Sequence, residues 1–427
     1  TVMTEDYSTP RHMAVAVDQS MVLEVGETKE MEERYQGITV LDGRGKLVMP
    51  GLTDGHTHVC QQLLRGRISD EFPMIWTRFL VPFESSLTDE EDVAASARLA
   101  CLQMIKSGTT SFADAGGTHM EQVAEVVLES GMRASLSRST MDKGEMIPAS
   151  MKAPAKACIQ RTEELYRHYN GKGDGRLAIW FGLRQIISCS DELIRMTGAR
   201  AAELKTGIHL HLAEHKDEVV YCLEHYHLRP VEYLHGIGGL GENVVAAHCV
   251  AVADREIPVM AASGMKVVHC PRANFCCQGF PKTPQFLDRG VTVGLGSDGA
   301  ARDDVSIFEE MKTIRTGLSA AWGLPVFDST ALPNKDILRM AAMGGAAAMQ
   351  MEGVKGAVKP GAKADLILIR THAPHLEPTS NLAYTVAETA YGSDVSDSII
   401  NGKLVMKERQ VLTLDEEAIL ADAGHRM

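Results

Sequence analysis

The sequence lacks any uninterrupted run of 18 uncharged apolar residues, and its N-terminus carries no signal-peptide pattern. A helix that crosses a bilayer needs about 20 consecutive, predominantly apolar residues, and a secreted chain begins with a basic segment followed by an apolar one. We therefore expect a soluble, cytoplasmic protein that has no membrane partner.

Positive charge is scarce as well. The 43 lysines and arginines stand against 56 aspartates and glutamates, which gives a net charge of −13. Because nucleic acids and anionic membranes attract basic patches, an acidic chain without a Lys/Arg cluster is a poor candidate for binding either. The expected partners are a small-molecule substrate and further copies of the chain, as a dimer or tetramer.

Paired cysteine motifs are missing. The nine cysteines are scattered, and none belongs to a CxxC pair, although Cys276 and Cys277 are adjacent. An odd number of dispersed cysteines suits free thiols in a reducing compartment. This pattern disfavours both a disulfide framework and a cysteine-ligated zinc site.

Strand-like and helix-like segments alternate through the middle of the chain. With residues 46–58, apolar β-rich runs make eight candidate strands, the others being 109–116, 132–139, 177–187, 206–214, 243–250, 265–271 and 290–298. Helical patterns at 120–130, 155–169 and 191–204 lie between them. Eight such units predict an α/β fold of the (β/α)8 TIM barrel type. A doubly wound open sheet is the alternative, but no GxGxxG loop supports it.

The two ends of the chain are rich in strand and turn residues instead. We expect residues 12–48 and 356–412 to pair into one small β-domain beside the barrel. The predicted division is therefore a composite β-domain from 1–48 plus 356–427 and a barrel from 49–355. A length of 427 residues suits one barrel of about 250 residues with an accessory domain.

Histidines and acidic residues stand at the predicted C-terminal ends of four strands: His56 and His58, His211 and Glu214, His248, and Asp298. Active-site residues of such barrels come from this edge, and histidine with carboxylate is a typical ligand set for catalytic zinc. Taken singly, His211 could be a core histidine beside His209, and Asp298 could be a helix N-cap. Four strand ends that meet in one cavity favour a metal site.

The segment 177–187 ends without a nearby lysine. One common arrangement of two metals needs a bridging, carbamylated lysine at this place. We therefore expect one divalent metal ion, with zinc as the first choice and iron as the alternative.

Several motifs resemble those of the amidohydrolase superfamily: "PGLTDGHTH" (50–58), "HLHLAEH" (209–215), "VVAAHC" (244–249), "HCPRANF" (269–275), "GLGSDGA" (294–300), "FEEM" (308–311), "PGAKADLIL" (360–368) and "INGKLV" (400–405). More narrowly, they resemble its triazine hydrolase and S-adenosylhomocysteine deaminase group. The resemblance covers nearly the whole chain in the same order. It implies a distorted (β/α)8 barrel with a small composite β-sandwich domain.

The resemblance also implies roles for single residues. It implies His56, His58, His211 and Asp298 as metal ligands, and Glu214 and His248 as proton-handling residues. A divalent metal lowers the pKa of a bound water toward ~7 and so supplies hydroxide, which would attack a ring carbon and release ammonia. Asp298 could take the water proton, Glu214 could protonate a ring nitrogen and then the leaving group, and His248 could stabilise developing charge.

Two residues stand at positions that resemble those of substrate-binding residues in guanine deaminases. Gln61 follows His58 by three residues, and Arg184 stands in "FGLRQIISCS", where S-adenosylhomocysteine deaminases usually carry a histidine in a "PHSPY"-like segment. An amide and a guanidinium can together bind a ring carbonyl and its neighbouring N–H. We expect a guanine-, pterin- or triazine-like amino ring as substrate. The plainer interpretation makes Arg184 a surface residue, or an ion-pair partner of Glu214 or Asp191.

Other features resemble deaminases of 5'-methylthioadenosine and S-adenosylhomocysteine, which are the alternative. These features are Trp76, Glu84 in "VPFE", Arg138 in "SRSTMD" and the stretch that begins at residue 371. A further alternative is a triazine or cyclic amide hydrolase. Two loops depart from the family pattern, "ANFCCQGF" (273–280) in place of "SNxxLGSG", and "GAARDDVSIF" (299–308). We expect His269 and Asn274 only to shape the first of these loops.

Overall fold

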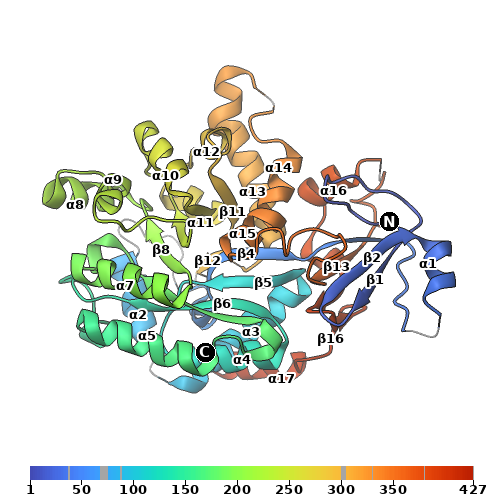
Figure 1. The fold of residues 1–427 in the computed structure, drawn as a ribbon, viewed down its shortest axis with the longest axis horizontal. Coiled ribbons are helices and arrows are strands. Elements are labelled where there is room, and N and C mark those ends of the chain that lie inside the picture. Colours follow the sequence, from blue (N-terminus) through green and yellow to red (C-terminus); the bar gives the residue numbers. More distant parts are fainter. Residues whose placement is uncertain are drawn as a thin grey trace.

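A parallel sheet of TIM-barrel type forms the larger part of the molecule (Figure 1). The computed structural model describes residues 1–36, 39–67, 76–86, 89–299, 304–328, 330–378 and 380–426. The strands neighbour one another in chain order: β4 (Leu52–His58), β5 (Thr109–Asp114), β6 (Arg133–Thr140), β7 (Leu177–Leu183), β8 (Ile208–Leu212), β9 (Val244–His248), β10 (Lys266–His269) and β11 (Thr292–Leu295). These eight strands confirm the predicted fold class.

The eighth strand is interrupted, and its second piece closes the sheet. A short strand, β12 (Asp298–Gly299), pairs in parallel with the carboxyl end of β4 at Thr57 and His58. Only residues 296 and 297 separate β12 from β11. The last strand therefore contacts β10 through its first half and β4 through its second half.

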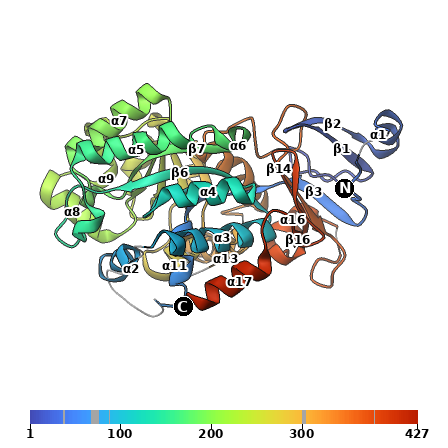
Figure 2. The same ribbon diagram turned by 90° about the horizontal axis from the view of Figure 1, so that it is seen from below.

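Helices cover the outside of this sheet, as Figure 2 shows for α3, α4 and α5. The helices between and after the barrel strands are α2 (Val81–Ser86), α3 (Glu90–Lys106), α4 (Met120–Ser130), α5 (Ala155–Tyr169), α6 (Lys172–Gly175), α7 (Asp191–Leu204), α8 (Lys216–Tyr226), α9 (Pro230–Gly236), α10 (Ile257–Ser263), α11 (Pro271–Cys277), α12 (Thr283–Asp288), α13 (Ile307–Leu318), α14 (Asn334–Arg339) and α15 (Gly345–Ala348). The predicted helices at 120–130, 155–169 and 191–204 match α4, α5 and α7.

Helix α3 illustrates how the sequence specifies this layer. The Asp89 side chain caps its first turn by accepting from the backbone N–H of Glu91. Val93, Ala97, Ala100 and Met104 are fully buried, and their spacing of three to four residues puts them on one face of the helix. That face packs on the barrel.

The chain ends form a second, antiparallel sheet, whose order is β16-β15-β14-β13-β3. Its strands are β3 (Lys46–Pro50), β13 (Leu366–Arg370), β14 (Val395–Ile400), β15 (Lys403–Lys407) and β16 (Gln410–Val411). A separate hairpin, β1 (Met13–Asp18) and β2 (Met21–Glu27), shares a small apolar core with this sheet through Val2, Val22, Val358, Ala364 and Leu366. The remaining helices are α1 (Thr28–Arg34), α16 (Leu382–Glu388) and α17 (Glu416–His425).

The predicted first barrel strand, 46–58, is in fact two strands in two different sheets. Residues 46–50 form β3 and pair with β13, whereas β4 starts the barrel at Leu52. The turn between them falls at Gly51, where a Cβ atom would lie 2.1 Å from Thr110 Oγ1. The predicted domain boundary after residue 48 thus falls inside β3, and the two-domain division remains a prediction. Across the described ranges, no helix combines the length and apolar character that a bilayer crossing requires.

Candidate active site

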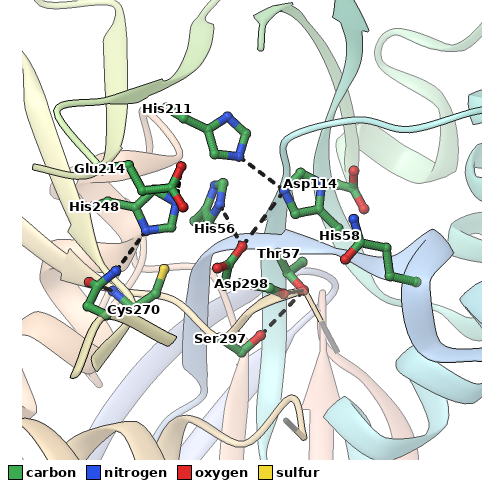
Figure 3. A network of polar contacts seen from close by, with 12 residues as sticks. His56, Thr57, His58, Asp114, His211, Glu214, His248, Cys270, Ser297 and Asp298 are labelled. Carbon is green, nitrogen blue, oxygen red and sulfur yellow. Dashed lines mark hydrogen bonds and ion pairs between the residues drawn. The ribbon is translucent and has the colours of Figure 1, made fainter. Parts of the chain in front are cut away.

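Four histidines and one aspartate converge at the carboxyl edge of the barrel (Figure 3): His56 and His58 on β4, His211 on β8, His248 on β9 and Asp298 on β12. Nitrogen and oxygen atoms of His56, His211, His248 and Asp298 all lie within 4.8 Å of one another. His58 Nε2 lies 3.1 Å from His211 Nε2 and 3.8 Å from Asp298 Oδ1. The structure thus brings together every residue that the sequence analysis placed at the metal.

Asp54 ties the first strand to the last and so places Asp298 against His56. Its Oδ1 accepts the backbone N–H groups of His56 (3.2 Å) and Ser297 (3.0 Å), and its Oδ2 accepts the Ser297 hydroxyl. His56 Nε2 and Asp298 Oδ1 are consequently 3.4 Å apart. Asp54 and Ser297 were not predicted as site residues, although both stand inside motifs of the family, at 50–58 and 294–300.

Hydrogen bonds on the far side of the rings orient two of the histidines. His58 donates from Nδ1 to the carbonyl oxygen of Gly116 (2.9 Å), so its Nε2 keeps a lone pair directed into the cluster. Gly116 is itself held by Asp114, whose Oδ1 accepts its N–H at 2.7 Å. His56 Nδ1 lies 2.8 Å from His209 Nε2, which leaves His56 Nε2 on the cluster side. His209 therefore orients His56 from behind.

His248 has the opposite arrangement. Asn274 donates from Nδ2 to His248 Nδ1 (3.0 Å), and its orientation is set because Asn274 Oδ1 accepts the N–H of Cys270. A neutral imidazole that accepts at Nδ1 carries its proton on Nε2. His248 therefore presents an N–H to the cluster, and a nitrogen with a proton offers no lone pair to a metal. His269 also holds this strand end, by donating to the carbonyl oxygen of His248 (2.8 Å).

Burial keeps His56, His58 and His211 neutral. It lowers the pKa of His56, and it lowers the pKa values of His58 and His211 well below the usual range. Burial works in the opposite direction on Asp298, but the neighbouring His248 and His56 outweigh it and hold the pKa of this carboxyl below its usual range. Neutral imidazoles beside an ionised carboxylate are the protonation states that a divalent cation needs.

Glu214, two residues beyond the end of β8, is the hydrogen-bonding centre next to the cluster. Its Oε1 accepts from Gln278 Nε2 (2.7 Å) and lies 3.0 Å from His215 Nε2, and its Oε2 accepts from Gln185 Nε2 (2.7 Å). Burial opposes ionisation, yet His215 and His248 outweigh it and lower the pKa of Glu214 to about 2. None of these three donors was predicted as a site residue. All three stand inside quoted motifs, His215 in 209–215, Gln185 in "FGLRQIISCS" and Gln278 in 273–280, but a motif does not show which of its side chains reaches a given carboxylate.

Gln61, Glu84 and Arg184 form a second buried group. Glu84 Oε2 accepts from Gln61 Nε2 (3.0 Å) and from Arg184 NH1 (3.1 Å). All three side chains are at most 2% exposed. The alternative interpretation of Arg184 as a surface residue is wrong, because its side chain is buried and forms an ion pair with Glu84 of α2. The group lies close enough for Arg184 to contribute to the lowered pKa of His58, after burial.

The other two predicted substrate residues are Arg138 and Trp76. Arg138, near the end of β6, donates from NH2 to both carboxylate oxygens of Glu121 (2.9 and 3.2 Å). Trp76 begins a π-helical turn (Trp76–Leu80), and its side chain lies outside the part of the chain that the structure describes.

The cluster fits a divalent cation. Among the described residues, His56 Nε2 is buried without a hydrogen-bond partner, and it points to the same place as His58 Nε2, His211 Nε2 and the Asp298 carboxylate. Three imidazole nitrogens and one carboxylate oxygen are a donor set that zinc accepts, with a further position left for water. The ligand set of a metal site is therefore present.

Comparison with known proteins places the chain in a family. The family model described as "Amidohydrolase family" matches residues 47–405. The 5-methylthioadenosine/S-adenosylhomocysteine deaminase of Pelotomaculum thermopropionicum is 38% identical, over 96% of this chain and 92% of that protein. The 5'-deoxyadenosine deaminase of Methanosarcina mazei is 35% identical, over 96% of this chain and 91% of that protein.

A solved structure agrees with the sequence relatives. The chain superposes on an adenosine deaminase from Xanthomonas campestris with bound zinc, with a TM-score of 0.90 and 27% identity, over 97% of this chain and 92% of that one. The resemblance that the motifs carried is thus confirmed along the full length of the fold. The chain belongs to the amidohydrolase family and is a deaminase of that family.

Proposed function

We propose that the protein is a metal-dependent hydrolytic deaminase of adenine rings in 5'-modified nucleosides, such as 5'-methylthioadenosine, S-adenosylhomocysteine or 5'-deoxyadenosine. The observation that carries this proposal is the convergence of His56, His211, His248 and Asp298 within 4.8 Å beside the buried Glu214. The relatives at 38% and 35% identity are named as deaminases of such nucleosides, which supports the proposal.

His56, His58, His211 and Asp298 are the proposed metal ligands, and zinc is the proposed metal. The relative with bound zinc supports this choice. A bound divalent ion would supply a nucleophilic water at neutral pH. His248 stands outside the ligand set because its Nδ1 accepts from Asn274, which leaves the proton on Nε2.

The protein residues then handle the protons. Glu214, which is ionised, accepts one proton from the attacking water and delivers it to a ring nitrogen. Asp298 accepts the second proton from the oxygen that is now bonded to the ring carbon, and this proton passes to the amino group, which leaves as ammonia. His248 donates a hydrogen bond from Nε2 to the oxygen that attacks the ring carbon, where charge develops. The net reaction adds water to the ring carbon and breaks its C–N bond.

The buried group of Gln61, Glu84 and Arg184 favours a nucleoside over the lactam-type ring that the sequence analysis preferred. The lactam interpretation requires an amide and a guanidinium directed at a ring carbonyl, but both donate to Glu84. A carboxylate has about four lone-pair sites, and among the described residues Gln61 and Arg184 occupy three of those on Glu84. The site that remains could accept from a sugar hydroxyl, which is a feature of nucleosides and not of free bases.

A substrate panel tests this proposal. Ammonia release by metal-replete protein is measured with 5'-methylthioadenosine, S-adenosylhomocysteine and 5'-deoxyadenosine against guanine, isoxanthopterin and an aminotriazine. Since mismatched polar groups cost about 10- to several-hundred-fold in kcat/KM, the nucleosides should lead by at least this factor. A preference for guanine or the pterin that disappears in Arg184→Ala would instead support the lactam-type assignment.

A further inference from the structure

Gln278 comes from the loop that departs from the family pattern, and it reaches into the active site. It directly follows α11, and its backbone N–H donates to the carbonyl oxygen of Asn274 (2.8 Å). The N–H of Gly279 donates to the same oxygen (2.9 Å), and its φ of +128° is a conformation that other residues rarely adopt. The chain therefore turns sharply at this point and directs the Gln278 side chain inward.

The Gln278 amide connects the two proposed proton-handling residues. Its Nε2 donates to Glu214 Oε1 at 2.7 Å, and its Oε1 accepts from Asn274 Nδ2 at 2.5 Å. The same Asn274 nitrogen donates to His248 Nδ1. Each amide has one possible orientation here. The N–H of Cys270 donates to Asn274 Oδ1, which fixes the Asn274 amide and, through it, the Gln278 amide.

The acceptor sites of Glu214 show what this connection does. Of about four lone-pair sites on a carboxylate, two on Oε1 are taken by Gln278 and His215, and one on Oε2 is taken by Gln185. The site that remains on Oε2 lies on the side of His248, whose Nε2 is 3.9 Å away (Figure 3). One oxygen of Glu214 is therefore saturated and the other faces the metal cluster.

We propose that Gln278 is a positioning residue that saturates Oε1 of Glu214, so that only Oε2 exchanges protons with the substrate. This inference rests on the role of Glu214 in the proposed function. Without the Gln278 amide, Oε1 has an open acceptor site and the carboxylate gains a second orientation. Since reacting groups that move by about 1 Å can lose a factor near 10² in rate, the loss should appear in kcat.

The test is a double-mutant cycle in the metal-replete enzyme. Gln278→Leu and, as a second shape-conserving variant, Gln278→Met are made in wild type and in Glu214→Gln. Gln160→Leu is the matched control, since Gln160 donates to Glu164 in the same way (3.0 Å) but on an exposed helix face. Steady-state kcat and KM, metal content and thermal midpoint are measured for each variant with the best substrate of the panel.

We expect both Gln278 variants to lower kcat by about 10- to 100-fold, with KM, metal content and thermal midpoint close to wild type and Gln160→Leu unaffected. In the Glu214→Gln background the same substitutions should add less than about threefold, because they act through that carboxylate. A kcat within threefold of wild type, an equal loss in both backgrounds, or a loss of metal in both Gln278 variants would overturn the proposal.

Two further results separate this inference from the proposed function. If a heterocycle other than an adenine nucleoside is turned over, the proposed substrate class fails, and the cycle is run with that heterocycle. If nothing in the panel reacts, crystal structures of metal-loaded wild type and Gln278→Leu decide. A Glu214 carboxylate that rotates or adopts more than one conformation in the variant supports a positioning role for Gln278, and an unchanged carboxylate contradicts it.

Discussion

Arg184 NH1 and Glu84 Oε2 are 3.1 Å apart in an ion pair whose two side chains are almost completely buried. The two residues are 100 positions apart in the chain, and they meet where α2 folds over the segment after β7. Because each side chain neutralises the other, the pair adds no net charge to the interior of the protein.

Breaking this pair from one side should cost more than removing it from both. Glu84→Ala leaves the Arg184 guanidinium buried without its carboxylate, and we expect the free energy of unfolding to fall by about 3–5 kcal/mol. The double variant Glu84→Gln/Arg184→Met removes both charges, and its free energy of unfolding should fall by less. Denaturant unfolding of the metal-loaded proteins measures the difference, and equal destabilisation of the two variants would show that the pair is not coupled.

The cluster should hold about one divalent ion per chain. The proposed ligands His56, His58, His211 and Asp298 converge on one place, so His211→Ala should lose the metal and the activity together. Elemental analysis of protein purified without chelators measures the metal content. Two tightly bound ions per chain, or a chelated His211→Ala protein with full activity, would contradict this ligand set.

Glu214→Gln should separate metal binding from turnover. Glutamine keeps the size of the side chain but cannot carry the proton, so we expect normal metal content and a kcat that is lower by about 10²–10⁴-fold. The relevant measurements are elemental analysis and single-turnover ammonia release on the same sample. A variant that loses metal but keeps its rate per bound ion would instead place Glu214 in the ligand set.

Glu218 should make stability depend on pH. Its side chain is 1% exposed on α8, where burial and then the neighbouring Glu214 raise its pKa to about 8. The folded state therefore keeps a proton that the unfolded chain releases near pH 4.5. The stabilisation is complete at or below that pH, and it is lost as pH rises toward 8.

Glu218→Gln removes this titration because a glutamine amide has no ionisable proton. The amide oxygen can still accept the N–H of Glu214, which donates to Glu218 Oε2 (3.3 Å) in the wild type. Between pH 4.5 and 8, the stability of wild type relative to the variant should fall by up to ~1.4 kcal/mol per pH unit. Denaturant unfolding at pH 5.5, 6.5, 7.5 and 8.5 tests this, with Glu224→Gln on the exposed face of α8 as the control. Stability curves that stay parallel would refute it.

Much of the fold and the core of the site could be predicted from the sequence alone. Apolar runs that alternate with helical patterns identified the barrel strands, because a parallel strand buried on both faces is a continuous apolar segment. The candidate ligands His56, His58, His211 and Asp298 could be found for a related reason. They stand at strand ends, and the carboxyl ends of parallel strands meet at one edge of a barrel.

Only the tertiary structure decided which residues pair across the chain. It divided 46–58 between two sheets at Gly51, where a close approach to Thr110 leaves no space for a side chain. It matched Arg184 with Glu84, and it brought Gln185 and Gln278 to opposite oxygens of Glu214. Local periodicity records which face of an element is buried, but it carries no information about a partner that lies 60 or 100 residues away.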